Sequence, residues 1–182
     1  KIGIVLPAFE EYLNRKKEED IVPYFANNHD YVYSANDLIA FYGDKEISAL
    51  LLVNPDDTTG NYINKIDVLK IAKWAQEKGI MFIVDESLVE FVDKEESGTL
   101  LDKSILRSYP NLVIVKSISK SFGVPGLRIG TLVSDNMDII NFIRKDVSIW
   151  NINSFAEFYL QIFEKYKSDY ENAMKEFKKV RN

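Results

Sequence analysis

The sequence predicts an α/β fold with an open, mostly parallel sheet that helices cover on both faces. Short apolar runs alternate along the chain with longer amphipathic segments. Several of these runs contain no polar residue, which is typical of strands buried on both faces. The chain has 182 residues, of which 46% are hydrophobic, so it can bury a sizeable core.

Six apolar runs are candidate strands. The run at 21–25 is the weakest, and the run at 127–133 is interrupted by Arg128. The expected strands are residues 2–6, 21–25, 49–53, 80–84, 112–115 and 127–133. The repetition of strand and helical segment favours an open α/β sheet.

The helix between the runs at 49–53 and 80–84 has clear boundaries. Asn64 can cap its first turn, and Asp67 complements the positive end of the helix dipole. Gly79 can adopt the left-handed conformation that ends many helices. Strand, helix and strand therefore form a parallel crossover.

The last segment has a different pattern. Apolar residues recur at helical spacing from 155 to 180, which predicts one long amphipathic helix. Such a helix is longer than the average in globular proteins. A solvated helix face is the simplest interpretation of the charged run at 165–179.

Composition excludes several classes of function. The net charge of −5 lacks the basic excess of a nucleic-acid binder. Cysteine is absent and His29 is the only histidine, which argues against disulfides, multi-histidine metal sites and any Ser-His-Asp triad that His29 does not serve. No apolar run approaches the ~20 residues that span a bilayer, and we find no signal peptide and no Gly-x-Gly-x-x-Gly turn of a dinucleotide-binding fold. We therefore expect a cytoplasmic protein without a metal site and without nucleic-acid or membrane partners.

Polar side chains follow three of the apolar runs. Asn54 follows the run at 49–53, and Asp85 follows the run at 80–84. The run at 112–115 is followed by Ser117, Ser119, Lys120 and, eight residues after the lysine, Arg128. Because the carboxyl ends of parallel strands meet at one edge of a sheet, these side chains should gather there. Together they suit an anionic ligand with a protonatable ring.

Each of these residues also has a simpler interpretation when it is taken alone. Asn54 can open a turn, and Asp85 can cap a following helix. A single lysine such as Lys120 is usually a solvated surface residue. The combination, in order and after three successive strands, favours a binding site.

Three motifs carry a resemblance to a known family. They are Asn54-Pro-Asp-Asp-Thr-Thr-Gly60, Val84-Asp-Glu86 and Ser117-Ile-Ser-Lys-Ser-Phe-Gly-Val-Pro-Gly-Leu-Arg-Ile-Gly130. They resemble the large domain of fold-type I pyridoxal-phosphate enzymes, in particular the histidinol-phosphate aminotransferase and threonine-phosphate decarboxylase branch of class I/II aminotransferases. The resemblance covers about residues 1–155. It implies a three-layer α/β/α fold and pyridoxal 5′-phosphate as the cofactor.

The resemblance implies a role for each candidate residue. Lys120 would form a Schiff base with the cofactor and move a proton at the substrate α-carbon. Asp85 would hold a proton on the pyridine nitrogen, and Asn54 would donate to the phenolic oxygen. The 5′-phosphate would be bound by Ser117, Ser119 and Arg128. Phe9 would stack on the cofactor ring; a phenylalanine packed in the core is the alternative there.

Two positions depart from the family pattern. The family usually has Tyr three residues after the aspartate, where its hydroxyl also donates to the phenolic oxygen, whereas this chain has Leu88. Asp57 and Thr58 alter the Asn-Pro-x-Asn-Pro-x-Gly form of the first motif. The expected activity is transfer of an amino group between an amino acid and a 2-oxo acid. Decarboxylation of an amino-acid phosphate and a non-catalytic module with the same fold are the alternatives.

The resemblance also predicts that the chain is part of a larger enzyme, truncated at both ends. The chain opens on an apolar run without an initiator Met. We assign residues 1–150 to a partial large domain that binds the cofactor, and 151–182 to a long helix that leads to a small C-terminal domain. We expect a homodimer, and no or negligible turnover from this chain alone.

Overall fold

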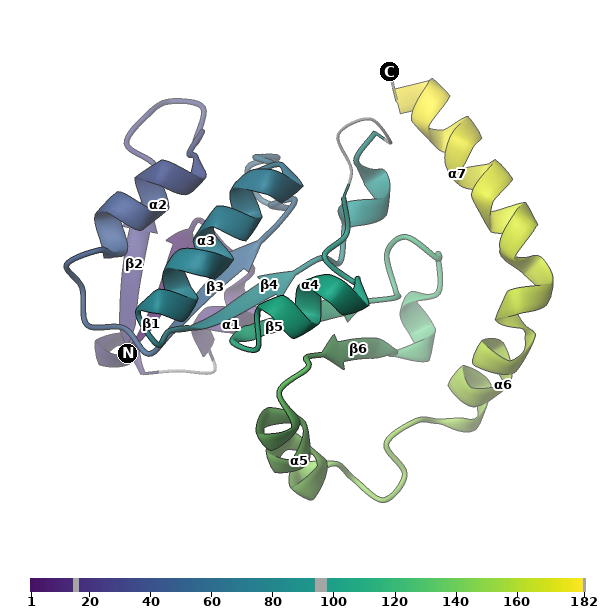
Figure 1. The fold of residues 1–182 in the computed structure, drawn as a ribbon. Helices are drawn as coiled ribbons and strands as arrows, with labels where there is room; N and C mark the ends of the chain where they lie inside the picture. The colour runs from purple at the N-terminus through teal and green to yellow at the C-terminus, as the bar shows by residue number, and fades with distance from the viewer. Residues whose placement is uncertain (15–16, 94–97, 182) are drawn as a thin grey trace.

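The computed structural model describes residues 1–14, 17–93 and 98–181. Six strands form one sheet with the order β2-β1-β3-β4-β5-β6, in which all neighbours are parallel except β5 and β6 (Figure 1). The strands are β1 (Ile2–Leu6), β2 (Ile21–Phe25), β3 (Ala49–Val53), β4 (Met81–Asp85), β5 (Leu112–Ser117) and β6 (Gly130–Val133). The predicted α/β class and mostly parallel sheet are confirmed.

Helices connect the strands and extend the chain beyond the sheet. The α-helices are α1 (Glu10–Asn14), α2 (Ala35–Tyr42), α3 (Lys65–Glu77), α4 (Lys103–Ser108), α5 (Met137–Asp146), α6 (Ser154–Phe163) and α7 (Lys167–Arg181). The short 3-10 helices are η1 (Glu18–Asp20), η2 (Val89–Phe91), η3 (Pro125–Leu127) and η4 (Glu164–Tyr166). Within the described residues, no helix is long and apolar enough to cross a membrane.

The predicted crossover between β3 and β4 is confirmed. The Asn64 side chain accepts a hydrogen bond from the backbone N–H of Asp67 and so caps α3. Gly79 follows the helix with φ 68°, the left-handed conformation that ends it at low cost. The two strands then pair in parallel over five residues each.

The core lies between the central strands and the helices that cover them. Leu50, Phe82 and Ile114, on three adjacent strands, are fully buried. Tyr42 of α2 is also buried, and its hydroxyl donates to the backbone oxygens of Ile4 and Val22. Gly3 permits this approach, because a Cβ there would lie 2.7 Å from the Tyr42 ring.

The strand predicted at 127–133 is shorter in the structure. Pro125–Leu127 forms η3, and Arg128 has φ 54° in the left-handed region. A residue in that conformation does not continue a strand, so pairing with β5 starts at Gly130. Gly130 lies close to β5, since a Cβ on it would be 3.2 Å from the Lys116 carbonyl oxygen.

The single long helix predicted over 155–180 is divided in the structure. The 3-10 helix η4 separates α6 from α7, and the two helices run along one side of the molecule (Figure 1). On either side of η4, Phe163 and Tyr170 both contact the ring of Phe122, at centroid distances of 5.1 Å and 4.4 Å. Both helices therefore pack on the turn that carries Phe122.

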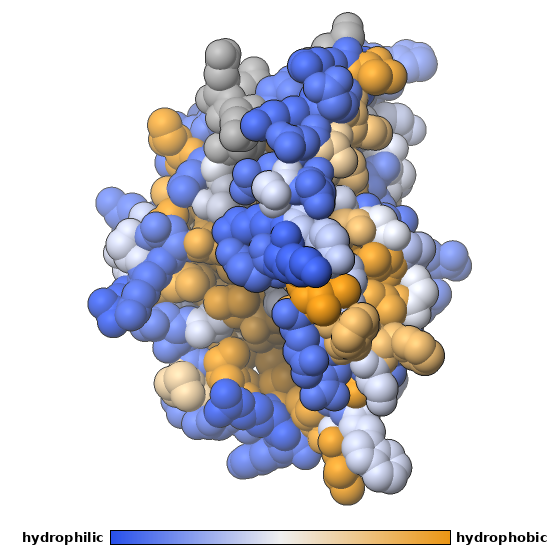
Figure 2. Space-filling view, turned by 90° about the vertical axis from the view of Figure 1, so that its right-hand side faces the viewer, coloured by the Kyte–Doolittle hydropathy of each residue, from blue (hydrophilic) through white to orange (hydrophobic). Residues whose placement is uncertain are grey.

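Apolar side chains are exposed on the same side of the molecule (Figure 2). They come from α5, α6 and the segment between these helices. The largest are Phe142, Ile149, Trp150, Phe155 and Phe158. Exposed apolar side chains that gather on one side mark an interaction site in many soluble proteins.

Candidate active site

The carboxyl ends of β3, β4 and β5 meet at one edge of the sheet. Val53 pairs with Asp85, and Asp85 pairs with Val115. The backbone N–H of Asn54 donates to the Asp85 carbonyl at 2.9 Å, which extends the pairing beyond the strands. The structure therefore brings together the three strand ends at which the sequence places polar residues.

Asp85 is the most firmly held side chain at this edge. It is 9% exposed, and its Oδ1 accepts hydrogen bonds from the backbone N–H of Ser87 at 2.8 Å and from the Ser87 hydroxyl at 2.5 Å. Its Oδ2 accepts a hydrogen bond from the Tyr12 hydroxyl. Burial, followed by the Asp85 carboxylate, raises the pKa of Tyr12 far above its usual value, so Tyr12 stays a neutral donor.

Ser87 and Phe9 connect Asp85 to its surroundings. The Ser87 hydroxyl accepts a hydrogen bond from the backbone N–H of Ser117 at 2.8 Å and thereby links the ends of β4 and β5. The Phe9 ring meets the Tyr12 ring edge to face at 6.2 Å. Phe9 is 57% exposed, so it is not a core residue, and its ring is accessible to a ligand at this edge.

Asn54 has a structural task of its own. Its Nδ2 donates to the Ile63 carbonyl at 2.8 Å, and its Oδ1 accepts from the Ile63 N–H at 2.9 Å. This pair of bonds closes the loop that leads to α3. One N–H of the buried Asn54 amide is left to donate to a ligand. The contact of Asn54 with the cofactor stays a prediction.

The turn after β5 carries the remaining predicted residues. Ser119 is buried, with its backbone N–H 3.3 Å from the Ser117 hydroxyl, whereas Lys120 is exposed. Arg128 is exposed as well, and its Nη1 donates to the Pro125 carbonyl at 3.2 Å. Hydroxyls, a forked guanidinium and an accessible amine are the groups that a phosphate and an aldehyde require.

Sequence reasoning missed Tyr12 and Ser87. Ser87 lies two residues after Asp85, the spacing of an Asx turn, and this signal could have found it. Tyr12 lies three residues after Phe9 on the short helix α1, and the sequence there has no strong helical pattern. Its contact with Asp85 spans 73 residues and depends on tertiary structure.

The chain is similar to known proteins over nearly its whole length. The sequence model of the family described as "Aminotransferase class I and II" matches residues 6–181. The chain belongs to this family. It is 32% identical over 184 residues to the L-serine phosphate decarboxylase of Sulfurospirillum multivorans, a match that covers 97% of the chain and 46% of the relative.

Solved structures of the family share the fold. The histidinol-phosphate aminotransferase from Clostridium acetobutylicum has a TM-score of 0.73 and 26% identity, over 98% of this chain and 56% of that protein. The PLP-bound C-S lyase from Staphylococcus hominis, with a TM-score of 0.77 at 16% identity, shows the fold alone over 98% of this chain and 46% of that protein. The chain thus spans about half the length of its relatives. Family and neighbours together indicate pyridoxal 5′-phosphate as the cofactor.

The residues at the strand edge fit this cofactor. A firmly held carboxylate, an accessible lysine and an accessible aromatic ring match its pyridine nitrogen, its aldehyde and its ring face.

No group of three or more His, Asp or Glu side chains in the described parts of the chain is placed to hold a metal ion. Leu88, three residues after Asp85, offers no hydroxyl. His29 is exposed between β2 and α2.

Glu86 follows Asp85 in the chain and is buried, with 2% of its surface exposed. Its oxygens accept hydrogen bonds from the Thr99 hydroxyl at 2.5 Å and the Leu100 N–H at 2.6 Å. Burial is the main cause that raises its pKa; the hydrogen bonds and Lys116 oppose the shift. The side chain ties the segment at 99–100 to the site.

The raised pKa predicts how Glu86 changes stability with pH. A raised folded-state pKa means that the folded protein binds this proton more tightly than the unfolded chain does. The contribution of Glu86 to the free energy of unfolding should be greatest below the pKa that Glu86 has in the unfolded chain. It should decline as the pH rises through the pKa of Glu86 in the folded protein. We expect the difference in unfolding free energy between wild type and Glu86→Gln to decline in this direction, measured by urea unfolding from about pH 4 to pH 8. Glu77→Gln, on the surface of α3, is the control, and a pH-independent difference for Glu86→Gln would contradict the prediction.

Proposed function

We propose that the chain holds pyridoxal 5′-phosphate at the carboxyl edge of its sheet and acts at the α-carbon of an amino acid. The observation that carries this proposal is the Asp85 carboxylate, which accepts three hydrogen bonds beside the turn that bears Lys120. A carboxylate in this arrangement is positioned before any ligand binds, which reduces the cost of binding.

Each residue has one task in this proposal. The cofactor, when bound, withdraws electrons from the substrate α-carbon. Lys120 would hold it covalently, with loss of water between its amine and the aldehyde, and would move a proton at the substrate α-carbon, while Asp85 would hold a proton on the pyridine nitrogen. Ser117, Ser119 and Arg128 bind the phosphate, Phe9 covers the ring, and the remaining N–H of Asn54 donates to the phenolic oxygen.

We propose decarboxylation of a phosphorylated amino acid as the first candidate reaction. The relative from Sulfurospirillum multivorans, an L-serine phosphate decarboxylase, supports it over nearly the full chain. Leu88 supports it as well, because the donor that the aminotransferase pattern has at this position is absent. Transamination is the second candidate, favoured by the match to the family as a whole.

Product analysis separates the two reactions. The protein at its full natural length is loaded with pyridoxal 5′-phosphate and incubated with O-phospho-L-serine, with and without a 2-oxo acid. Decarboxylation releases carbon dioxide and leaves phosphoethanolamine without any acceptor. Transamination yields a new 2-oxo acid over many turnovers only when an acceptor is present, and without an acceptor it stops at one equivalent per loaded site. A loaded protein that forms neither product from a panel of amino acids and amino-acid phosphates would contradict both reactions and favour a non-catalytic module.

A homodimer is part of the proposal, supported by the exposed apolar residues of α5 and α6. Burying such side chains against a second copy would stabilise the pair by about 25 cal/mol per Å² of apolar surface. We expect sedimentation equilibrium to show self-association that Phe155→Ser together with Phe158→Ser weakens at least about tenfold. A wild type that remains monomeric at high concentration would contradict the prediction.

A further inference from the structure

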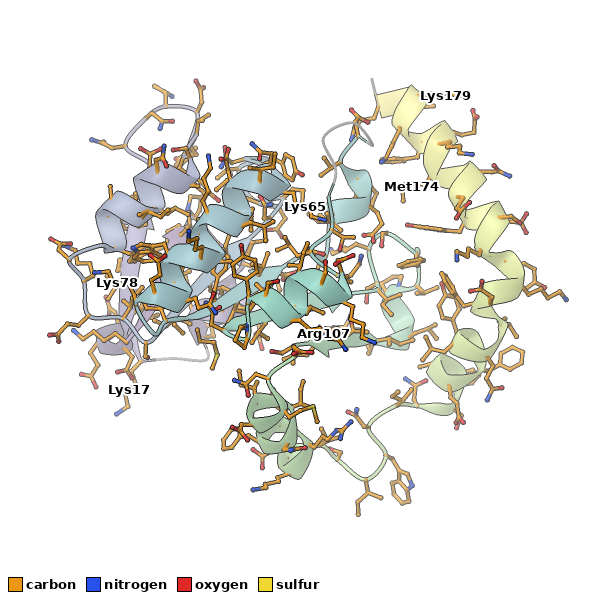
Figure 3. The ribbon with its side chains drawn as sticks, in the orientation of Figure 1. Lys17, Lys65, Lys78, Arg107, Met174 and Lys179 are labelled. Atoms are coloured by element: carbon orange, nitrogen blue, oxygen red, sulfur yellow. The ribbon has the colours of Figure 1, made fainter. Side chains whose placement is uncertain are left out.

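Helix α7 presents one face to the residues that follow Asp85 and Lys120. Its partly buried residues Tyr170, Met174 and Lys178 are four positions apart and therefore share a face. Figure 3 shows Met174 on the side of α7 toward the sheet, whereas Lys179 lies near the end of the helix. No charge or hydrogen bond in the proposed reaction uses this face, so its contacts need another explanation.

The C-terminal half of α7 is fixed to the segment after Asp85. The ring of Phe177 meets that of Phe91 in η2 at 5.4 Å. The Lys178 ammonium donates to the Val92 carbonyl, and Arg181 donates to the Phe91 carbonyl and to both carboxylate oxygens of Asp93. These contacts set the distance between the helix and η2.

The N-terminal half of α7 packs on the turn that carries Lys120. Tyr170 stacks on Phe122 with centroids 4.4 Å apart and an interplanar angle of 24°. Phe122 lies two residues after Lys120, inside a turn closed by backbone bonds from Phe122 to Ile118, from Gly123 to Lys120 and from Val124 to Ser119. A shift of α7 would therefore move the turn.

Three buried polar atoms lie between these elements without a hydrogen-bond partner among the described residues. They are Glu90 Oε2, Ser121 Oγ and the Tyr170 hydroxyl. The other oxygen of Glu90 pairs with Lys116, which precedes Ser117 on β5. Burial, followed by the Glu90 carboxylate, raises the pKa of Tyr170 to about 12, and Ser121 opposes the shift, which places the Tyr170 hydroxyl near both groups.

The chemistry of the three groups is complementary. Ser121 and Tyr170 each supply a hydroxyl that can donate, whereas the Glu90 carboxylate oxygen can only accept. A buried polar atom without a partner destabilises the folded state, so small rotations that join these groups are favourable. Ser121 follows Lys120 directly, which couples any such bond to the lysine.

We propose that Tyr170 is a positioning residue for Lys120. The Tyr170 hydroxyl joins Ser121 and Glu90 in a hydrogen-bonded cluster, and this cluster fixes the turn that carries Lys120 against α7. The meaning of this cluster for catalysis rests on the proposed function. The existence of the cluster does not rest on the proposed function, because its residues fix the turn whether or not the cofactor is bound.

Amide hydrogen exchange of the cofactor-free chain tests the cluster directly. Tyr170→Phe keeps the stacking on Phe122 but removes the hydroxyl. We expect the protected amides of residues 118–124 to exchange about fivefold faster, the effect of losing one hydrogen bond on local opening. Tyr166→Phe removes a hydroxyl from an exposed ring one turn earlier and should leave these amides unchanged.

A second pair of variants separates the hydroxyl from the fold. Ser121→Ala should repeat the effect of Tyr170→Phe, and Ser121→Thr, which keeps a hydroxyl, should restore most of the protection. After loading with pyridoxal 5′-phosphate, the visible circular dichroism per bound cofactor should fall in Tyr170→Phe and Ser121→Ala, because the lysine no longer holds the ring in one orientation.

The outcomes distinguish this inference from the proposed function. Unchanged exchange at 118–124 in Tyr170→Phe, or equal effects of Ser121→Ala and Ser121→Thr, would overturn the cluster even if the cofactor binds. A wild-type chain that binds no cofactor at Lys120 would overturn the proposed function, while the exchange data would still decide the cluster. If Tyr170→Phe does not fold, the comparison of the two Ser121 variants decides it.

Discussion

Asp85→Asn is expected to weaken binding of pyridoxal 5′-phosphate about 10- to 100-fold. The substitution keeps the shape but removes the charge that holds a proton on the pyridine nitrogen, and hydrogen bonds to charged groups contribute about 1.5–3 kcal/mol. It also places an amide N–H toward either Tyr12 or Ser87, each of which donates to Asp85 in the wild type. Titration of the visible absorbance of the bound cofactor measures the effect.

Asp135→Asn is the matched control for this change, because Asp135 is exposed after β6 and away from the strand edge. Its affinity for the cofactor should equal that of the wild type. Equal affinities of Asp85→Asn and wild type would show that the carboxylate does not contact the cofactor, and the assignment of the pyridine end of the site would fail.

Lys120→Ala is expected to abolish covalent attachment of the cofactor. Only an amine forms a bond with the aldehyde that borohydride can reduce, and the turn at 119–122 presents Lys120 to solvent at this edge. The amount of cofactor fixed by borohydride should fall at least about 100-fold, while non-covalent binding through Asp85 and the phosphate site should persist more weakly. Mass spectrometry of the intact chain measures the attached cofactor.

Lys145→Ala is the control for Lys120→Ala, since Lys145 is exposed on α5. It should retain the full amount of fixed cofactor. Undiminished attachment in Lys120→Ala would mean that another amine performs this task, because the alanine side chain has none.

The sequence predicts the sheet well because local and tertiary preferences agree there. The runs at 49–53, 80–84 and 112–115 are apolar throughout, and such runs have one stable place, in a sheet with both faces covered. Their order then fixes which ends meet, so Asn54, Asp85 and Ser117 can be placed at one edge without coordinates. The boundaries of α3 were predictable for a similar reason, since Asn64 and Gly79 act within a few residues of the chain.

The remaining features depend on contacts between distant residues. The helical pattern over 155–180 is continuous, and nothing in it marks the 3-10 turn η4 at which the structure divides it. The left-handed conformation of Arg128 is likewise not indicated by the sequence, because arginine rarely adopts it. Tyr12 could not be assigned because its partner lies 73 residues away.

The candidate site shows the same division. The identity of the polar groups followed from their positions after strands, but their partners did not. Asn54 looks like a free donor in the sequence, whereas its amide closes the loop at Ile63. Glu86 is next to Asp85 in the sequence, but its carboxylate accepts hydrogen bonds from the Thr99 hydroxyl and the Leu100 N–H.

Reduction with borohydride followed by peptide mapping tests the central claim most directly. The wild-type chain is incubated with pyridoxal 5′-phosphate, reduced, digested and sequenced by mass spectrometry. The account predicts one dominant modified peptide, with the cofactor on Lys120. Label distributed over surface lysines, or concentrated on any other single lysine, would contradict the placement of the cofactor at the strand edge.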